Sequence, residues 1–289
     1  MNSRREESAS GRKPEIVIFV APRDNAEKYL NVLRDELTKR GWRILQVVKL
    51  GSNVDENALA SCDFVLTLGG DGTILYASRE VDNYGKPILG VNLGRIGLLT
   101  ELSPQEFLEN IEDIERGNYT VIEAMKIVAR KSGKTLSPVL NEYALITSKP
   151  GKIIGLQVFV DDKFIVKVLC DGLIISTPIG STSYALSAGG AVVSDLMEAI
   201  ILVPIAPLYR AMYPLVVPPQ LTIRVRIEEG WADALLIADG RIVGKVSCGE
   251  EVEFIKADEK TRFIRLQHPL SRIRRVMSLV DLSVRGRRS

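Results

Sequence analysis

The first part of the chain carries two hydrophobic patterns, one typical of buried strands and the other of amphipathic helices. Three mainly apolar runs have the length and bulky side chains of strands, at residues 16–20, 44–48 and 64–68. Residues 25–40 instead repeat apolar side chains at helical spacing and end before Gly41, and a shorter helical segment covers residues 57–60. This β-α-β-α-β series predicts a parallel sheet with right-handed crossovers.

The same alternation continues through the next part of the chain. A helix is predicted over residues 73–79, and an apolar run that begins at Pro87 leads into a second set of glycine turns. Ser103 and Glu106 have the spacing of a capping box, with a proline at the first helical position between them. We therefore expect a helix over residues 106–116.

From Tyr119 onward the pattern changes to short β-type runs separated by turn residues such as Asp161-Asp162 and Asp239-Gly240. The predicted strands cover residues 121–131, 142–147, 155–160, 164–169, 173–177, 221–227, 234–238 and 251–255. The expected fold class is therefore α/β plus β, with an N-terminal Rossmann-like parallel α/β domain and a C-terminal, largely antiparallel β domain.

The expected domain boundaries follow these changes of pattern. We expect a disordered tail at residues 1–13, the α/β domain at 14–118 and the β-rich domain at 119–270. A C-terminal segment at 271–289 carries several arginines, and such a charge run usually indicates a solvated tail. Our hypothesis is that residues 273–282 pack back on the N-terminal domain while the last arginines stay mobile as a basic tail.

Composition excludes several classes of protein. The chain has 289 residues, of which 46% are hydrophobic, and this is ample for a sizeable core. A net charge of +2 and an aromatic content of 6% give no basic face for nucleic acid. The N-terminus lacks the apolar core of a signal peptide, and no run reaches the ~18 apolar residues of a membrane helix. We therefore expect a cytoplasmic protein without nucleic-acid or membrane partners.

Cysteine and histidine usage limits the possible chemistry. Cys62, Cys170 and Cys248 are widely spaced, so we expect reduced cysteines instead of a disulfide framework or a zinc site. His268 is the single histidine, which argues against a His-dependent triad and excludes a His-rich metal site. General base catalysis then falls to a carboxylate, and a metal ion would be magnesium-like and held by oxygen, with help from substrate phosphates.

The stretch Gly69-Gly70-Asp71-Gly72-Thr73 follows the third apolar run and is the first candidate for a functional site. The glycines let the backbone turn tightly and approach another molecule. The helix that follows would direct free amides and the positive end of its dipole to the same place, which favours phosphate. Ligands usually bind at this carboxyl edge of a parallel sheet. The alternative is a plain strand-to-helix turn in which Asp71 is the N-cap.

Two further polar clusters interrupt the apolar pattern of the β-rich region. Residues 170–190 combine Asp171, a glycine turn, closely spaced serines and threonines, Tyr184 and a helix start. Hydroxyls and free amides suit sugar hydroxyls, phosphates or a base edge, and Tyr184 could stack on an aromatic ring. The alternative is a capped helix after a Pro-Ile-Gly turn. The pair Asn141-Glu142 stands where a β domain normally carries apolar residues, or else forms an edge turn.

The order of these motifs resembles the NAD kinase family over nearly the full folded length. Gly-Gly-Asp-Gly-Thr at residues 69–73 is followed by Asn-Glu at 141–142. Asp-Gly and then Thr-Pro-x-Gly-Ser-Thr-x-Tyr-x-Leu-Ser-x-Gly-Gly follow within residues 171–190. The order makes the resemblance specific, because related lipid kinases and phosphofructokinases share Gly-Gly-Asp-Gly-Thr alone.

The resemblance implies an enzyme that phosphorylates the adenosine ribose 2′-hydroxyl of NAD to give NADP. It assigns Asp71 as the proton acceptor, Asn141 and Glu142 to the ribose and adenine parts of NAD, and Asp171 to the nicotinamide amide. Lys152 is a candidate beside the phosphates. The remaining binding residues that it implies are Gly69, Gly70, Gly72, Thr73, Thr182, Ser183, Tyr184, Ala185, Leu186 and Ser187, of which the last six face the adenine side.

The resemblance also implies cofactors and partners. The phosphoryl donor would be ATP or inorganic polyphosphate, and Mg²⁺ would be held through substrate phosphates, with no metal site made by the protein itself. Family members are homo-oligomers, so we expect a homodimer or homotetramer whose sites use neighbouring subunits.

Three departures from the family pattern put fine substrate contacts in doubt. Ile179 replaces a hydroxyl residue, Leu169 replaces an arginine whose place Lys167 could take, and Leu208 replaces a frequent histidine. Two other functions stay open at this point. An exposed apolar entrance for acyl chains would favour a diacylglycerol-type lipid kinase, and loss of the acid at position 71 would favour a non-catalytic NAD-binding regulator.

Overall fold

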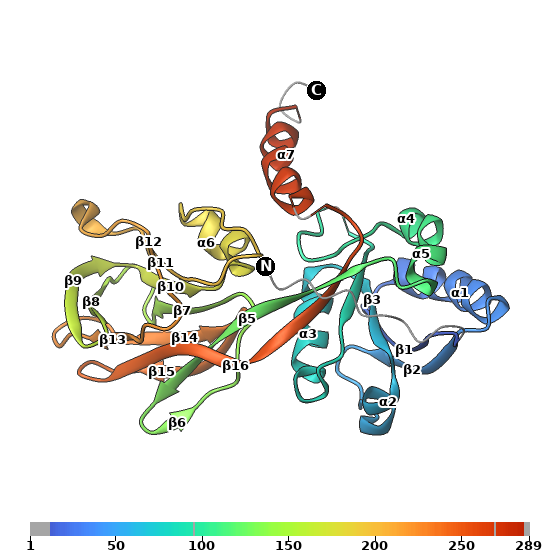
Figure 1. Cartoon of the computed structure of the whole chain (residues 1–289). Coiled ribbons are helices and arrows are strands. Elements are labelled where there is room, and N and C mark those ends of the chain that lie inside the picture. Colours follow the sequence, from blue (N-terminus) through green and yellow to red (C-terminus); the bar gives the residue numbers. More distant parts are fainter. Residues whose placement is uncertain (1–11, 95, 269, 286–289) are drawn as a thin grey trace. The chain divides into compact units, whose positions relative to one another are not determined.

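The computed structural model describes residues 12–94, 96–268 and 270–285, except for the side chains of Arg210 and of residues 279–285. The predicted tail at residues 1–13 therefore lies outside the described residues except for its last two, as do the final arginines at 287 and 288. The chain forms two compact units, Met1–Glu123 with Lys260–Ser289 (unit 1) and Ala124–Glu259 (unit 2). Both boundaries fall inside long strands, so β5 (Thr120–Lys131) and β16 (Glu251–Arg265) contribute to both units (Figure 1).

Unit 1 is built on a parallel sheet in the strand order β2-β1-β3-β4-β16. Its first four strands are β1 (Glu15–Val20), β2 (Arg43–Lys49), β3 (Phe64–Gly69) and β4 (Ile88–Asn92). The helical elements are α1 (Asp24–Lys39), α2 (Glu56–Ser61), α3 (Asp71–Glu80), η1 (Asp82–Tyr84), α4 (Pro104–Glu109), α5 (Ile111–Glu115) and α7 (Ser271–Arg285). The predicted parallel α/β fold is confirmed.

Helices on both faces of this sheet explain why its strands are continuously apolar. Ile16 and Ile18 of β1 share a core cluster with Leu33 of α1. Phe19, which points to the other face, contacts the ring of Tyr76 in α3 at a centroid distance of 6.0 Å. A strand buried on both faces needs apolar side chains at every position, as the sequence pattern indicates.

The predicted capping box is present at Ser103, whose hydroxyl accepts from the Glu106 amide while the Glu106 carboxylate accepts from the Ser103 amide. The single helix predicted over residues 106–116 is wrong, because α4 and α5 are separate helices that meet at Asn110. Asn110 leaves helical geometry, and its side-chain amide donates to the Glu106 carbonyl. Such local side-chain bonds compete with the helical ladder.

Unit 2 is a sandwich of antiparallel sheets. One sheet has the order β12-β11-β10-β7-β14-β15, and the other contains β9-β8-β13 next to β16, with β5 also paired to β16. The strands not yet given are β6 (Lys134–Thr135), β7 (Glu142–Thr147), β8 (Ile154–Val160), β9 (Lys163–Cys170), β10 (Gly172–Ser176), β11 (Ile200–Ile205), β12 (Leu215–Val217), β13 (Ile223–Ile227), β14 (Ala234–Ala238) and β15 (Arg241–Val246). Its short helices are η2 (Gly180–Thr182), α6 (Tyr184–Ser187) and η3 (Leu208–Arg210). The predicted antiparallel β region is confirmed.

The core of unit 2 lies between these sheets. Tyr143 of β7 and Phe254 of β16 are fully buried, and their rings approach to a centroid distance of 5.6 Å. The same cluster includes Leu145 and Val158 from opposite sheets. Burying the inner faces of two sheets in this way stabilises the sandwich mainly through removal of apolar area from water.

Two other sequence expectations have a structural outcome. Cys62 and Cys170 are buried free thiols, and Cys248 is a half-buried free thiol. His268, which the sequence suggests is a strand-end or surface residue, follows the end of β16 and is exposed. Across the described part of the chain, no helix is both long enough and apolar enough to cross a membrane.

Candidate functional site

The glycine-rich motif of unit 1 lies where β3 ends and α3 begins, at the carboxyl edge of the parallel sheet. Gly69 is the last residue of β3, Gly70 is the N-cap and Asp71 is the first residue of α3. The helix therefore begins two residues before the predicted Thr73. The alternative in which Asp71 is the N-cap is wrong, because that position belongs to Gly70, which has no side chain to cap with.

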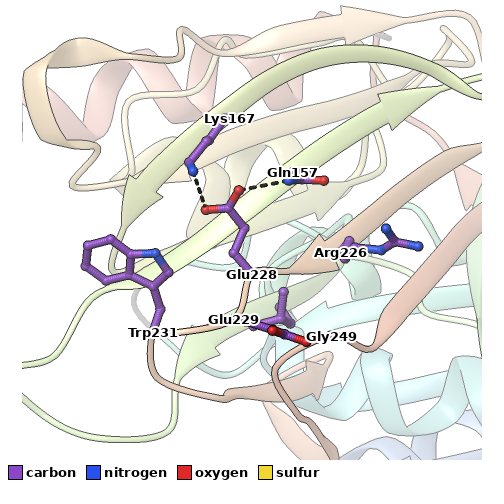
Figure 2. A pocket seen from close by; sticks show the side chains of 8 residues that line it. Gln157, Lys167, Arg226, Glu228, Glu229, Trp231 and Gly249 are labelled. Carbon is purple, nitrogen blue, oxygen red and sulfur yellow. Dashed lines mark hydrogen bonds and ion pairs between the residues drawn. The ribbon is translucent and has the colours of Figure 1, made fainter.

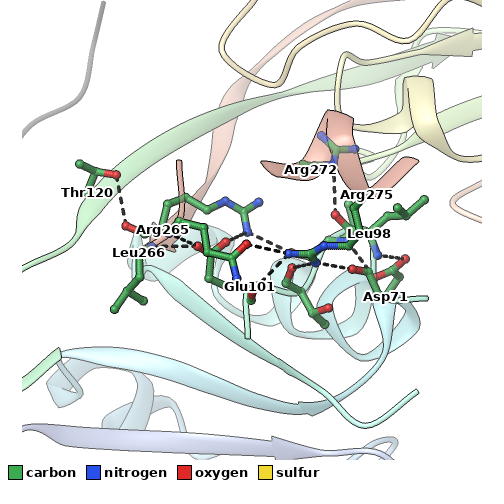
Figure 3. A network of polar contacts seen from close by, with 12 residues as sticks. Asp71, Leu98, Glu101, Thr120, Arg265, Leu266, Arg272 and Arg275 are labelled. Atoms are coloured by element: carbon green, nitrogen blue, oxygen red, sulfur yellow. Dashed lines mark hydrogen bonds and ion pairs between the residues drawn. The ribbon is translucent and has the colours of Figure 1, made fainter. Parts of the chain in front are cut away.

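The Asp71 carboxylate is held by a neighbouring loop instead of its own helix. The amide of Leu98 donates to Oδ2 at 3.0 Å, and the amide of Leu99 donates to Oδ1 at 2.9 Å (Figure 3). Each carboxylate oxygen has a second lone pair, so the group can still accept a proton or a further hydrogen bond. These contacts fix the orientation of a half-buried acid at the end of a strand.

The glycines of the motif differ in what surrounds them. A Cβ atom on Gly69 would lie 2.1 Å from Oγ1 of the buried Thr73, so the fold itself requires glycine there. Gly70 and Gly72 would place a Cβ in open space, with no protein atom within 4 Å. Packing against Thr73 explains why residue 69 is a glycine. Neither packing nor a positive φ explains the glycines at positions 70 and 72, and the open space beside both could accommodate a ligand.

In unit 2, Asn141 and Glu142 lie at the start of β7 and are almost completely buried, with 6% and 7% of their surface exposed. Asn141 Oδ1 and Glu142 Oε2 have no hydrogen-bond partner among the described residues. Buried polar atoms are normally satisfied, and leaving one unsatisfied costs about 1–3 kcal/mol. These two acceptors are therefore candidates for ligand binding.

Asp239, at the turn between β14 and β15, holds the Asn141-Glu142 pair in place. Its Oδ1 accepts from the Asn141 amide at 2.8 Å and the Glu142 amide at 3.2 Å, and Oδ2 accepts from the Leu140 amide at 3.0 Å. The Asp239 amide donates back to the Glu142 carbonyl at 3.0 Å. From the sequence alone, Asp239 was predicted only to be a turn residue. The contact joins residues far apart in the chain, so spacing alone gives no signal for it.

Burial raises the pKa of Glu142 to about 7, and the nearby Asp239 carboxylate acts in the same direction. The Ser183 hydroxyl and the Tyr184 amide lower this pKa, but less than burial raises it. Taking a carboxylate out of water penalises its charged form. Glu142 therefore changes charge close to neutral pH, which is unusual for a glutamate.

The hydroxyl-rich segment of unit 2 uses many of its side chains inside the protein. The hydroxyls of Thr177 and Ser181 donate to the carbonyls of Leu140 at 2.6 Å and Pro178 at 2.7 Å. A Cβ atom on Gly180 would lie 2.1 Å from the Asn141 carbonyl oxygen. This packing ties the segment to the strand start that carries Asn141 and Glu142.

The six predicted residues at 182–187 have different environments. Thr182 is buried and donates to the Ile179 carbonyl at 3.2 Å, and Ala185 is a core residue. Ser183 accepts from the Asn141 side-chain amide at 3.4 Å. Tyr184 is exposed over 38% of its surface, Leu186 is half-buried and Ser187 is exposed. The structure thus places Ser183 and Tyr184 beside Asn141 and Glu142.

Asp171 and Lys152 lie at the other end of the same sheet region. Gly172 is paired with Ile146 and Ser176 with Glu142, so Asp171 is five strand positions from Ser176, about 17 Å along β10. Asp171 is exposed, and its carbonyl accepts from the Thr147 amide. Lys152 is exposed in the turn before β8. Within one copy of unit 2, these two residues are therefore not brought to the Asn141-Glu142 pair.

A separate open pocket of about 530 Å³ in unit 2 surrounds Glu228 (Figure 2). The Lys167 ammonium lies 2.9 Å from Glu228 Oε2, and the Gln157 amide donates to Oε1 at 2.9 Å. Trp231 closes one side of the pocket. Both oxygens of the buried carboxylate have a protein partner, so this pocket shows no unsatisfied group that would need a ligand. Lys167, which the sequence analysis offered as a substitute for an arginine at position 169, is engaged here.

The described residues contain no group of three or more His, Cys, Asp or Glu side chains arranged to hold a metal ion. The departure at position 179 is buried and the one at 208 is exposed over 39% of its surface. Sequence reasoning missed the role of Asp239. Leu98 and Leu99 lie in the second set of glycine turns, but the bonds from their amides to Asp71 were not predicted. Arg272 and Arg275 lie in the C-terminal charge run, and they bind the loop instead of being solvated.

Comparison with known proteins gives a consistent result. The ATP-NAD kinase N-terminal domain matches residues 6–119, and the ATP-NAD kinase C-terminal domain matches residues 140–266. An NAD kinase of Methanothermobacter thermautotrophicus is 38% identical over 204 residues, which cover 71% of this chain and 72% of that protein. An NAD kinase of Marinomonas sp. is 36% identical over 245 residues, covering 82% of this chain and 80% of that protein.

Solved structures agree with these matches. The crystal structure of an NAD kinase from Archaeoglobus fulgidus in complex with ATP has a TM-score of 0.77 at 30% identity and covers 91% of this chain and 99% of that one. Yeast NADH kinase complexed with NADH also has a TM-score of 0.77, covering 94% and 89%, but its identity of 21% supports only the shared fold.

Proposed function

This chain belongs to the ATP-NAD kinase family and produces NADP from NAD, and on this premise we propose that Asp71 accepts the proton of the adenosine ribose 2′-hydroxyl during transfer. The observation that carries this role is the acid itself, fixed by two loop amides at the start of a helix. Phosphoryl transfer relies mainly on positioning and charge stabilisation, and the base only has to take a hydroxyl proton. One rigidly held carboxylate meets that need.

The phosphates are proposed to lie against Gly70 and Gly72. The open space beside both glycines supports this placement, as does the position of Gly72 in the first turn of α3, where helical amides can bind an anion. The ten-residue helix directs its positive end to the same place. A Mg²⁺ ion held by these phosphates would neutralise their charge.

NAD is proposed to bind to Asn141 and Glu142 through its ribose and adenine parts. Their unsatisfied buried oxygens can accept hydrogen bonds from ribose hydroxyls or the adenine amino group. The exposed ring of Tyr184, next to Ser183, is suited to stacking on the base. Ser187 is exposed in the same short helix. Thr182 and Ala185 are buried, so they pack the segment against the protein instead of facing NAD.

We propose ATP as the phosphoryl donor, since the Archaeoglobus fulgidus NAD kinase, 30% identical to this chain, was crystallised with ATP. Asp171 and Lys152 are proposed to complete the site of a neighbouring copy in a homo-oligomer, because both are exposed and lie far from Glu142 in the same unit.

Purified protein incubated with NAD, Mg²⁺ and either ATP or polyphosphate should form NADP with ATP. If NADP forms with polyphosphate but not with ATP, the proposal of ATP as the donor is wrong. If diacylglycerol is phosphorylated and NAD is not, the assignment of NAD as the acceptor is wrong.

The buried Glu142 gives a prediction for pH dependence. The pKa of Glu142 in the folded protein, about 7, lies above the ordinary value of 4.5. Protonation of Glu142 therefore stabilises the folded protein when no ligand is bound. This contribution is fully present below pH 4.5 and is lost as the pH rises through 7, and it amounts to about 3 kcal/mol. Glu142→Gln should therefore raise the stability of the free protein at pH 8, measured by urea unfolding, and flatten its dependence between pH 5 and 8.

The same substitution should weaken NAD binding, because Gln lacks the charge that accepts hydrogen bonds from the nucleotide. For the wild type, NAD affinity measured by calorimetry should be lower at pH 6 than at pH 8, whereas Glu142→Gln should bind weakly at both. A loss of kcat in Glu142→Gln with unchanged NAD affinity would show that Glu142 acts in the chemical step and would reverse its assignment as a binding residue.

A further inference from the structure

We propose that Arg275 and Arg272, on the first turns of the C-terminal helix α7, are positioning residues for the Asp71 carboxylate. This inference rests on the proposed role of Asp71. The two arginines contact the loop at residues 97–101, and this loop in turn provides the amides that hold Asp71 (Figure 3). All of these residues belong to unit 1.

Arg275 binds three carbonyl groups of the loop at once. Its Nη1 donates to the carbonyls of Gly97 at 2.7 Å and Thr100 at 2.9 Å, and its Nη2 donates to that of Glu101 at 3.3 Å. Nη2 also donates to the side chain of Gln267 at 3.1 Å, which orients the guanidinium from behind. Only the planar fork of an arginine provides this many donors in fixed geometry.

The remaining carbonyls of the loop are bound by two other arginines. Arg272 is buried, and its Nε donates to the Leu98 carbonyl at 3.1 Å. Nη1 of Arg265 in β16 donates to the Leu99 carbonyl at 3.1 Å and to Glu101 Oε2 at 3.0 Å. Glu101 Oε1 accepts from the amides of Leu266 and Gln267, which ties the loop to the end of β16. Every carbonyl from residue 97 to residue 101 thus accepts from an arginine.

These contacts act on the same peptide groups that hold the acid. The Gly97 carbonyl and the Leu98 amide belong to one peptide unit, as do the Leu98 carbonyl and the Leu99 amide. Arg275 therefore binds the carbonyl of the peptide group whose N–H donates to Asp71 Oδ2. Arg272 binds the carbonyl of the next peptide group, whose N–H donates to Oδ1. Hydrogen bonds linked in a chain polarise one another, so each arginine orients and strengthens the bond to the carboxylate.

The loop needs this support because it has little structure of its own. Residues 96–101 belong to neither a helix nor a strand. Gly97 has a left-handed φ of 62°, and its backbone passes so close to Asn92 and Thr100 that a Cβ would lie within 2.4 Å of both. The arginines bind the Gly97 and Leu98 carbonyls themselves, whereas other polar contacts of the loop lie further along, where the Glu101 amide donates to the Gly90 carbonyl at 2.9 Å. A displacement of 1 Å at a catalytic group can cost about 100-fold in rate.

The test compares Arg275→Lys with Arg274→Lys. Lysine keeps the charge at position 275 but loses the planar fork, whereas Arg274 is exposed on the same helical turn and serves as the matched control. We expect Arg275→Lys to lower kcat about 10- to 100-fold, with KM and calorimetric Kd for NAD within about threefold. Arg274→Lys should retain wild-type values. Arg272→Lys, which removes the contact of Nε with the Leu98 carbonyl, provides a second variant in case Arg275→Lys does not fold.

The decisive measurement repeats Arg275→Lys in an Asp71→Asn background. If Arg275 acts through Asp71, the double variant should have nearly the same kcat as Asp71→Asn alone. An equal fold-loss in both backgrounds, or a kcat of Arg275→Lys within twofold of wild type, would overturn the positioning role while leaving the role of Asp71 intact. Full turnover of Asp71→Asn would instead overturn the proposed function, and with it this inference.

Discussion

Asp71→Asn should lower kcat by about 100-fold or more while NAD affinity changes little. The substitution keeps the size of the side chain but removes the proton acceptor. It also turns one hydrogen-bond acceptor into a donor, so either Leu98 or Leu99 loses the partner of its amide. We therefore also expect a moderate loss of stability, of about 1–3 kcal/mol, from this unsatisfied amide.

Three measurements separate these effects: kcat at a temperature where the variant is folded, NAD affinity by calorimetry, and the free energy of unfolding in urea. A lower stability with unchanged turnover would mean that Asp71 only supports the loop. The N-cap alternative predicts little change in either stability or activity, because asparagine caps a helix about as well as aspartate.

Gly69→Ala and Gly72→Ala should have opposite effects on the fold, although the two residues are only three positions apart. At Gly69 a methyl group would collide with the buried Thr73, and overpacking of this kind costs about 1–3 kcal/mol. At Gly72, in the first turn of α3, a methyl group meets open space, and alanine should stabilise the helix by up to about 1 kcal/mol.

Activity should not follow stability in this pair. We expect Gly72→Ala to lower kcat/KM about 10-fold or more, because its methyl group would occupy the space proposed for a phosphate. Unfolding in urea and steady-state kinetics on both variants test the prediction. A Gly72→Ala enzyme that is both stable and fully active would remove the glycine turn from the proposed phosphate site.

The apolar runs made much of the fold predictable, because a strand buried on both faces and an amphipathic helix leave different periods in the sequence. β7 and β14 begin and end at the residues that the pattern predicts, Glu142–Thr147 and Ala234–Ala238. β11 was missed, although it lies inside a sheet. Its run is interrupted by Pro204, which normally argues against an interior strand.

Long-range features account for the other failures. β16 was expected to stop at residue 255 but continues to Arg265, where Phe263 pairs with Ile88 of β4. Charged residues such as Lys256, Asp258 and Lys260 interrupt the apolar pattern in this second half, so the strand leaves no clear signal in the sequence there. At the candidate site, the sequence named Asp71, Asn141 and Glu142, which are side chains in local motifs. It could not name the backbone amides that bind Asp71, since any residue type can supply an amide.

The pairing of β4 with the end of β16 sets an order on biosynthesis. The loop that holds Asp71 is made early, yet Arg275 lies 178 residues further along the chain than the Gly97 carbonyl that it binds. An N-terminal domain commonly folds while the ribosome is still adding residues, at about 5–20 per second. Here the N-terminal sheet lacks its last strand, and the loop lacks its arginines, until β16 and α7 have been translated. A ribosome that stops before residue 260 would therefore release a chain that carries the whole glycine-rich motif but has no arginines to orient its acid, so incomplete products should be catalytically silent.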